Sequence, residues 1–401
     1  MSSPALSHVE QAAITFPSLA ENYNELGSLF QKKLYKQLTD KIWDFLSDDE
    51  NNIDGNFITL WFNFVVHLER KINQLSLGKI AVRVCEFYSP DDHESSRALL
   101  DTLLTKPGLL GPAANLFISV SLGSLLLSTP NPTPHFPSVK AILATAHKTL
   151  TTTLASHEHS SNDTSCHSAF FKAQMQYYKL IGPADAFYKN CLMFLSYTNC
   201  ASQANGGSLK DSERVVIARD ISLAAISGEG IFNFGEVVET PVLQSLLSTP
   251  DAWLLNLMEC FSKGDVNGYN KVMAASKSQF DSQPALKNKA TFIHEKITLL
   301  ALVDMVFTRE STERCISFEE IAARCQVDIN QVEWVVMRGI SLGLVKGSMD
   351  QVAGNFEVKW VLPRVLNKEQ ISVLSEKLGE WETKVGDMKG RVLDATVELL
   401  H

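Results

Sequence analysis

The sequence lacks the short motifs that mark most catalytic and nucleotide-binding domains. It has no GxxxxGK[ST] phosphate-binding loop and neither HRD nor DFG, which argues against a P-loop NTPase or a protein kinase. The seven cysteines are scattered without a CxxC pair, a pattern typical of reduced thiols in a cytosolic or nuclear protein. The first residues carry no basic stretch followed by an apolar run, so a secretory signal is not expected.

Excess positive charge is missing as well. The 401 residues carry a formal net charge of −9, so general affinity for the phosphate backbone of nucleic acids is not expected. A composition with 45% hydrophobic and 20% charged residues is ordinary for a globular protein, and the length allows about two or three domains. The uncharged run 109–128 contains Pro112, Asn115 and several serines, so we expect a buried helix rather than a membrane span.

The first 310 residues show helical periodicity and no convincing strand alternation. Apolar residues between 29 and 46 share one broad face, and similar patterns recur after short polar breaks. These helices are of comparable length and are joined by short turns. Their apolar faces are too large to be buried within a single pair of helices, which predicts a solenoid of stacked helix pairs. Four prolines within 128–138 predict a break in this array, and the polar segment 156–168 predicts an exposed connection.

The pattern changes at Ser317. Ser317 followed by Glu320 is a capping-box signature that opens one helix, and Asp328 followed three residues later by Gln predicts the cap of a second. Gly343 suits the left-handed residue that ends this second helix. Two short segments, LVKGSM and FEVKWV, surround the turn-rich DQVAGN and read as two strands. Together they predict a helix-turn-helix with a wing.

The charge of this winged helix does not suit DNA. Residues 315–361 include four basic and six acidic side chains, whereas DNA binding requires basic residues around the recognition helix. The edge of the wing offers another use, because a partner protein can extend a sheet by strand addition. Alternation in FEVKWV places Phe356, Val358 and Trp360 on one face, which makes them a hypothetical partner interface. The alternative is that these three side chains complete the core of the domain.

The tail after Pro363 carries the most regular pattern in the sequence. Apolar residues recur there with alternating spacings of three and four, which predicts a long helix with one narrow apolar seam for another helix. The predicted partner-interface positions of this seam are Ile371, Leu374, Leu378, Trp381, Val385, Met388, Val392 and Leu399. Glycines inside the helix each cost about 1 kcal/mol relative to alanine, so we expect it to depend on its partner.

Two segments resemble a metal site and a phosphate-binding loop, but neither has the residue spacing that such a site needs. His157, His159, Cys166 and His167 fall within eleven residues, but the metalloprotease pattern counted from His159 needs Ser and Asp where the chain has His167 and Phe170. The segment GEGIFNFGEVV lacks the GxGxxG spacing and follows a helical stretch, so its glycines indicate a turn between helices. We therefore expect no catalytic, cofactor-binding or metal-binding residue, no cofactor, and no enzyme activity.

The sequence resembles the PCI-domain proteins, which are scaffold subunits of the proteasome lid, the signalosome and a translation initiation complex. The resemblance rests on LAAISGEGIFNFGEVVETPVLQSL, WLLNLMECFSKGDVNGY, SFEEIAARCQVDINQVEWVVMRGISLGLVKGSMDQV and WVLPRVLN, and is closest to a lid subunit. It continues more weakly through YKQLTDKIWDFL and NQLSLGKI, and 104–163 departs from it most.

The resemblance implies a mainly α-helical fold with four parts. These are an N-terminal helical-repeat solenoid (1–210), the helical part of the PCI domain (211–310), its winged helix with a small sheet (311–363), and a heptad helix for bundle formation (364–401). It implies a non-catalytic subunit in the cytoplasm and nucleus, whose partners are other lid PCI subunits and the deubiquitinating metalloprotease pair. A signalosome subunit and a winged-helix nucleic-acid-binding protein are the alternatives.

Overall fold

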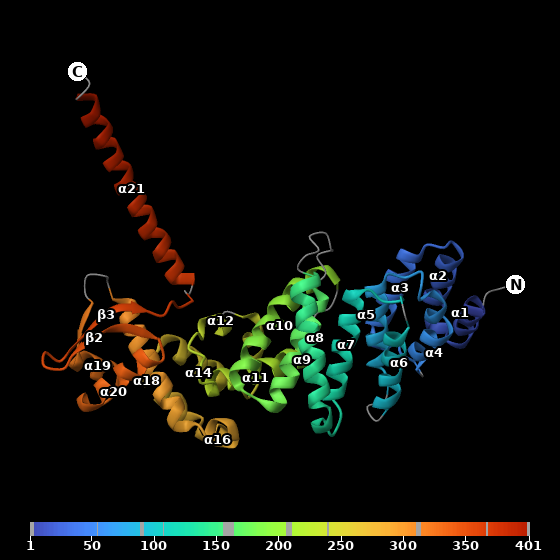
Figure 1. Ribbon diagram of the computed structural model, residues 1–401, viewed down its shortest axis with the longest axis horizontal. Coiled ribbons are helices and arrows are strands. Elements are labelled where there is room, and N and C mark those ends of the chain that lie inside the picture. Colours follow the sequence, from blue (N-terminus) through green and yellow to red (C-terminus); the bar gives the residue numbers. More distant parts are fainter. Residues whose placement is uncertain are drawn as a thin grey trace. The chain divides into compact units, whose positions relative to one another are not determined.

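A computed structural model describes residues 4–398 except 54, 89–91, 107, 155–163, 206–210, 239, 310–313 and 366–367. The chain forms two compact units, Met1–Ser208 and Leu209–His401. The fold is mainly α-helical with one small sheet, as the sequence predicts (Figure 1).

The first unit is a row of helices in which sequence neighbours pack together (Figure 1). Alternate helices also meet, since α5 packs on α7 and α7 packs on α9. The helices are α1 Pro4–Thr15, α2 Ala20–Gln31, α3 Tyr35–Ser47, α4 Asn56–Asn63, α5 Gln74–Cys85, α6 His93–Thr105, α7 Pro112–Leu127, α8 Phe136–Thr149, α9 Ser165–Ile181 and α10 Ala184–Asn205. This stacking of short helices buries apolar faces that one pair could not cover, as expected for a solenoid.

Two details of this unit differ from simple periodicity. The apolar face between 29 and 46 belongs to two helices, because Lys33 adopts a left-handed conformation (φ 57°) between α2 and α3. Of the polar connection predicted at 156–168, residues 156–163 lie outside the described residues, and α9 already begins at Ser165. The uncharged run 109–128 is confirmed as a buried helix: α7 packs against its neighbours on several sides. In the described part of the chain, no helix is long and apolar enough to cross a membrane.

The second unit begins with a further group of helices. They are α11 Asp211–Ser227, α12 Gly235–Val238, α13 Pro241–Gln244, α14 Ala252–Lys263, α15 Val266–Ala275, α16 Lys277–Ser282, α17 Pro284–Lys287 and α18 Ala290–Thr308. The predicted turn in GEGIFNFGEVV is present between α11 and α12. Lys296 of α18, fully buried, donates hydrogen bonds to the carbonyl oxygens of Ala225 and Gly228 at 2.7 and 2.6 Å. A cation placed at the C-terminal end of α11 meets the negative end of the helix dipole.

The winged helix follows α18. It consists of β1 Cys315–Ser317, α19 Phe318–Cys325, α20 Ile329–Ser341, β2 Val345–Asp350 and β3 Asn355–Val361, with the long helix α21 Lys368–Glu398 after it.

The Ser317 hydroxyl accepts the backbone N–H of Glu320, and Gly343 has φ 68° after α20, so both predicted helix boundaries are confirmed. Asp328 stands at the N-cap of α20 but makes no side-chain capping bond. The sequence predicted two strands, and the sheet has a third, β1, in the order β1-β3-β2.

Candidate protein-interaction surfaces

The wing does not present the edge that the sequence predicted. Strand β3 is the central strand, paired with β1 on one side and β2 on the other, so its backbone is not open to strand addition over 355–357. Phe356 is 0% exposed and Val358 is 7% exposed, because both side chains point into the core of the domain. The interface hypothesis is therefore wrong for Phe356 and Val358, and the alternative of a core role is correct for them.

Trp360 differs from these two side chains because the strand is irregular next to it. Lys346 pairs with Trp360 and Gly347 pairs with Val358, so Lys359 is an extra residue in β3, a β-bulge. The extra residue breaks the alternation, and Trp360 is 39% exposed on the outer side. The Lys346 ammonium lies 4.9 Å from the centre of the indole ring. Trp360 is thus an exposed aromatic on a rigid sheet, and its role in a partner interface stays a prediction.

Helix α20, which occupies the place of a DNA-recognition helix, has an apolar outer surface. Ile329, Trp334 and Met337 are all more than half exposed. The helix's one basic side chain, Arg338, donates a hydrogen bond of 2.8 Å to the carboxylate of Glu295 on α18. Its one basic group is therefore engaged within the chain rather than free for phosphates, and its exposed amides are limited to Asn330 and Gln331 in the first turn. An apolar surface of this kind suits a protein partner.

The segment between the wing and α21 is fixed to the body of the second unit. The N–H of Leu362 donates to the Leu344 carbonyl at 2.8 Å, and Arg364 donates to the Asp304 carboxylate at 2.8 Å. Arg364 also donates to the Ser262 carbonyl. The other carboxylate oxygen of Asp304 accepts from Arg324 of α19 at 2.9 Å. One carboxylate thus joins α18, the winged helix and the segment that leads to α21.

Gly235 shows how closely this segment packs. A Cβ atom at Gly235 would lie 2.9 Å from the Cβ of Val365 and 3.2 Å from its carbonyl oxygen, so a larger residue would push the segment away. The glycine belongs to the GEGIFNFGEVV segment, whose start is held by Lys296. Neither this contact nor the Asp304 network has a recognisable signal in the sequence.

Helix α21 carries the predicted apolar seam on its surface. Its described seam residues are between 45% and 70% exposed: Ile371, Leu374, Leu378, Trp381, Val385, Met388 and Val392. Leu399 lies outside the described residues. Apart from its chain neighbours and the backbone of α21 itself, a Cβ atom added at Gly379, Gly386 or Gly390 would meet no described atom within 4 Å. A seam of seven exposed apolar residues on one helix is costly in water, so it is typical of a surface that another helix covers.

The residues considered for a metal site do not come together in the described part of the chain. In the parts of the chain that the structure describes, no group of three or more His, Cys, Asp or Glu side chains could hold a metal ion. Of the four residues considered for a metal, His157 and His159 lie outside the described residues, Cys166 is buried, and His167 stacks on Tyr197 at 5.0 Å between ring centres. Burial lowers the pKa of His167.

One sequence motif of serine hydrolases is present, but the backbone structure that the motif requires is not formed there. The segment GISLG, Gly339 to Gly343, fits the GxSxG pattern of a nucleophile elbow. A nucleophile elbow needs a sharp turn from a strand into a helix, but here the serine, Ser341, ends α20. The buried thiols are also unsuited to act as nucleophiles, because burial raises the pKa of Cys85 and of Cys325 to about 12. A thiolate nucleophile is disfavoured at both positions.

Comparison with known proteins gives the family. The family model for PSD13 N-terminal repeats matches residues 22–258, and the model for the PCI domain matches residues 269–360. The chain belongs to the PSD13 family of PCI-domain proteins. The resemblance to PCI-domain proteins and the helical-repeat prediction are therefore confirmed. Helix α21 lies beyond both matched regions.

The PSD13 relatives are similar over nearly their whole length. The chain is 33% identical over 387 residues to 26S proteasome non-ATPase regulatory subunit 13 homolog B of Arabidopsis thaliana, with 95% of each chain covered. It is 28% identical over 398 residues to the Dictyostelium discoideum subunit 13, with 98% of each covered. It is also 28% identical over 393 residues to 26S proteasome regulatory subunit RPN9 of Saccharomyces cerevisiae, covering 94% of this chain and 93% of that one.

Proposed function

We propose that this PSD13-family chain is a non-catalytic structural subunit of the lid of the 26S proteasome regulatory particle. The observation that carries the proposal is its similarity, over nearly the full length of both chains, to proteins named as 26S proteasome regulatory subunits. Its role is to support the degradation of ubiquitinated proteins by holding other subunits in place. The exposed seam of α21 and the apolar surface of α20 support a scaffold role, because both suit protein partners.

The proposed partners are other PCI subunits of the lid and the deubiquitinating metalloprotease pair. The winged helix, with Trp360 and the outer side of α20, provides surfaces for a neighbouring PCI subunit. The seam of α21 has the period of a helix that enters a bundle with helices of other chains. Because no group of described His, Cys, Asp and Glu side chains could hold a metal ion, we assign metal-dependent ubiquitin removal to a partner. We further propose that the chain resides in the cytoplasm and the nucleus.

Two alternatives are less well supported. Full-length similarity to proteins named as 26S proteasome subunits favours the proteasome over the signalosome. A nucleic-acid-binding role is opposed by the net charge of −9 and by the ion pair that engages Arg338.

The test is purification of the tagged full-length chain from cells, with mass spectrometry of the proteins that accompany it. The proposal predicts proteasome lid subunits in amounts equal to the tagged chain, together with the metalloprotease pair. Recovery of signalosome subunits, or of nucleic acid lost steeply with added salt, would overturn it. Fluorescence microscopy of the same tagged chain tests the proposed localisation.

A further inference from the structure

The apolar seam of α21 has a row of basic side chains along one side. Lys377, Lys384 and Arg391 follow one another at intervals of seven residues, and each lies three residues after a seam residue. Residues with these spacings share one side of a helix, so the three side chains form one flank of the seam. We call this flank the basic row. All three of its side chains are exposed.

The other side of the seam has no such row. Its corresponding positions, four residues after a seam residue, hold Ser375, Glu382 and Lys389, and the two charges among them cancel. When two helices pair, the residues beside the apolar seam face each other and determine which partner is accepted. On α21, the side with the basic row therefore distinguishes partners by the sign of their charge.

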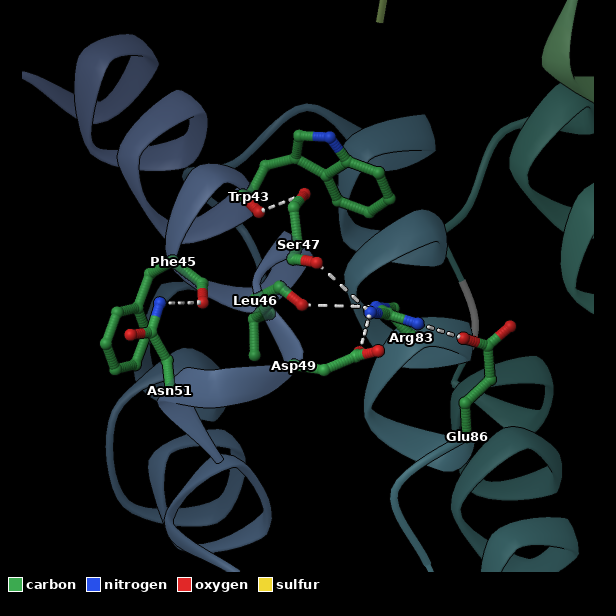
Figure 2. Close-up of polar contacts among 8 residues, drawn as sticks. All are labelled: Trp43, Phe45, Leu46, Ser47, Asp49, Asn51, Arg83 and Glu86. Atoms are coloured by element: carbon green, nitrogen blue, oxygen red, sulfur yellow. Dashed lines mark hydrogen bonds and ion pairs between the residues drawn. The ribbon is translucent and has the colours of Figure 1, made fainter. Parts of the chain in front are cut away.

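The basic row differs from the basic side chains that hold the chain together. Figure 2 shows one of the latter: Arg83 pairs with Glu86 and with Asp49 at 2.6 Å each, and it donates to the Leu46 carbonyl at 3.1 Å. In the described part of the chain, in contrast, no carboxylate oxygen lies within 4.0 Å of a side-chain nitrogen of the basic row. The three cations of the row are thus not engaged inside the chain.

Two carboxylates of α21 stand near the basic row without binding it. Glu380 and Asp387 precede Lys384 and Arg391 by four residues, a spacing that permits an ion pair on a helix. Neither pair is closed in this part of the structure. Exposed pairs within one helix contribute little to stability, so carboxylates of a partner can compete for these cations once the seam is covered.

The arrangement of charge also argues against two other occupants of the seam. Residues 371–392 carry four basic and four acidic side chains, so the helix lacks the excess positive charge that an anionic membrane surface attracts. A second copy in antiparallel orientation would set basic row against basic row. A parallel copy would bring Lys377 to Glu382 but Lys384 to Lys389, and these two interactions offset each other.

We propose that α21 selects a partner helix that carries Asp or Glu beside its own apolar seam, and that the basic row makes this selection. The inference rests on the proposed scaffold function, because it specifies the kind of helix that the seam accepts. The apolar seam supplies affinity to any helix of matching period, whereas the row distinguishes an acidic flank from a basic one.

Fluorescence anisotropy with the full-length chain at physiological ionic strength tests the proposal. The probes are two labelled, end-blocked peptides of four heptads, repeats of EIAALEK and of KIAALKE, which share one apolar seam and carry acidic or basic residues on both of its sides. We expect the EIAALEK peptide to bind at least about tenfold more tightly. The net charge of the chain, −9, would by itself favour the KIAALKE peptide, so this preference reports the local row.

Variants of the basic row provide the decisive comparison. Lys377→Glu with Lys384→Glu and Arg391→Glu should invert the preference, and a gain in binding of the KIAALKE peptide cannot result from unfolding. Lys377→Gln with Lys384→Gln and Arg391→Gln should bind both peptides within about threefold of each other. The control, Ser372→Asp with Thr383→Asp and Gly390→Asp, changes the net charge by the same amount as the glutamine variant but away from the seam, and should keep the preference for EIAALEK.

The proposal is overturned if neither peptide binds, if the KIAALKE peptide binds as tightly as EIAALEK, or if the row variants keep the preference of the unaltered chain. A dimer in sedimentation velocity that the seam variant Trp381→Asp dissociates would assign the seam to a second copy instead. Binding to phosphatidylserine vesicles that the same variant abolishes would assign it to a membrane. These outcomes are separate from the proposed function, which fails only if lid subunits do not accompany the tagged chain.

Discussion

Arg364 and Asp304, sixty positions apart in the sequence, form an ion pair of 2.8 Å in which both side chains are largely buried. Asp304 lies on α18 and Arg364 lies between the wing and α21, so the pair fixes the starting point of the C-terminal helix. Arg324 from α19 shares the same carboxylate at 2.9 Å. Partly buried hydrogen bonds between charged groups stabilise folded structure by about 1.5–3 kcal/mol, more than exposed ion pairs do.

Replacing Asp304 with Asn should loosen the segment that leads to α21. The substitution keeps the shape but removes the charge that holds Arg324 and Arg364, at a cost of about 2 kcal/mol. Amide hydrogen exchange at Leu362 should then become roughly 30-fold faster, because local opening of this segment exposes the amide. Asp251→Asn is the control, since its pair with Arg219 is longer, 3.6 Å, and more exposed. Equal protection of Leu362 in Asp304→Asn and the unaltered chain would contradict the assigned role.

The wing offers a matched pair of aromatic substitutions. Phe356→Ala should destabilise the second unit by about 3–5 kcal/mol, because it leaves a cavity under a fully buried ring. Trp360→Ala should change stability far less, because its ring is partly exposed and lies beside the Lys346 ammonium. Trp360→Ala should instead weaken capture of neighbouring lid subunits from cell extract. The measurements are thermal unfolding and the yield of co-purified subunits. Normal capture by a folded Trp360→Ala chain would remove Trp360 from the interface.

The cysteines should differ sharply in reactivity. Cys315 is exposed, whereas burial raises the pKa of Cys85 and Cys325 to about 12. At about pH 8, iodoacetamide should label Cys315 first and leave Cys85 and Cys325 unmodified until the chain unfolds. Peptide mass spectrometry of timed samples measures this order. Rapid labelling of Cys85 or Cys325 in the folded chain would contradict their burial.

The same thiols predict a loss of stability in alkali. Their pKa in the folded chain lies above the ordinary value of 9.0, so the folded state binds more protons than the unfolded state once the pH exceeds that value. Their stabilising contribution is complete below about pH 9 and declines as the pH rises toward about 12. Cys85→Ala with Cys325→Ala should reduce the alkaline slope of the thermal midpoint. An unchanged slope would show that other groups control it.

The seam of α21 should be needed for assembly and not for folding of the rest of the chain. Leu374→Asp with Trp381→Asp and Met388→Asp places three charges in the apolar stripe, which a helix partner could not bury. This triple variant should fail to enter the lid while its other helices keep their thermal melt. The control variant, Ser372→Asp with Thr383→Asp and Gly390→Asp, adds the same charge on the opposite face of α21. Normal incorporation of the seam variant would contradict the assigned role of the helix.

Local signals in the sequence predicted local structure well. Ser317 and Gly343 mark the ends of helices by backbone requirements that each residue meets by itself, and the seam of α21 follows from periodicity. The wing was less predictable, because one extra residue, Lys359, turned Trp360 away from the face of Phe356. Bulges depend on the register between strands and leave little trace in one strand's sequence.

Contacts between distant residues were not predictable at all. The pairing of Asp304 with Arg364 and the anchoring of Lys296 depend on which helices meet in three dimensions. The groove of about 630 Å³ that α7 lines has the same origin. Its serines looked like minor interruptions of an apolar run, and only the packing of α7 among its neighbours gave them a common exposed side. Family membership, in contrast, was predictable from the sequence, because the similarity extends over most of the chain.

The most direct test of the proposed function is native gradient sedimentation of the endogenous protein from cell extract, with peptidase and deubiquitinase activities assayed across the fractions. A structural subunit of the lid must travel with the very large particle that carries both activities. We expect the chain to peak in those fractions. A peak at the size of the single chain, or in a smaller assembly without peptidase activity, would contradict the assignment to the 26S proteasome.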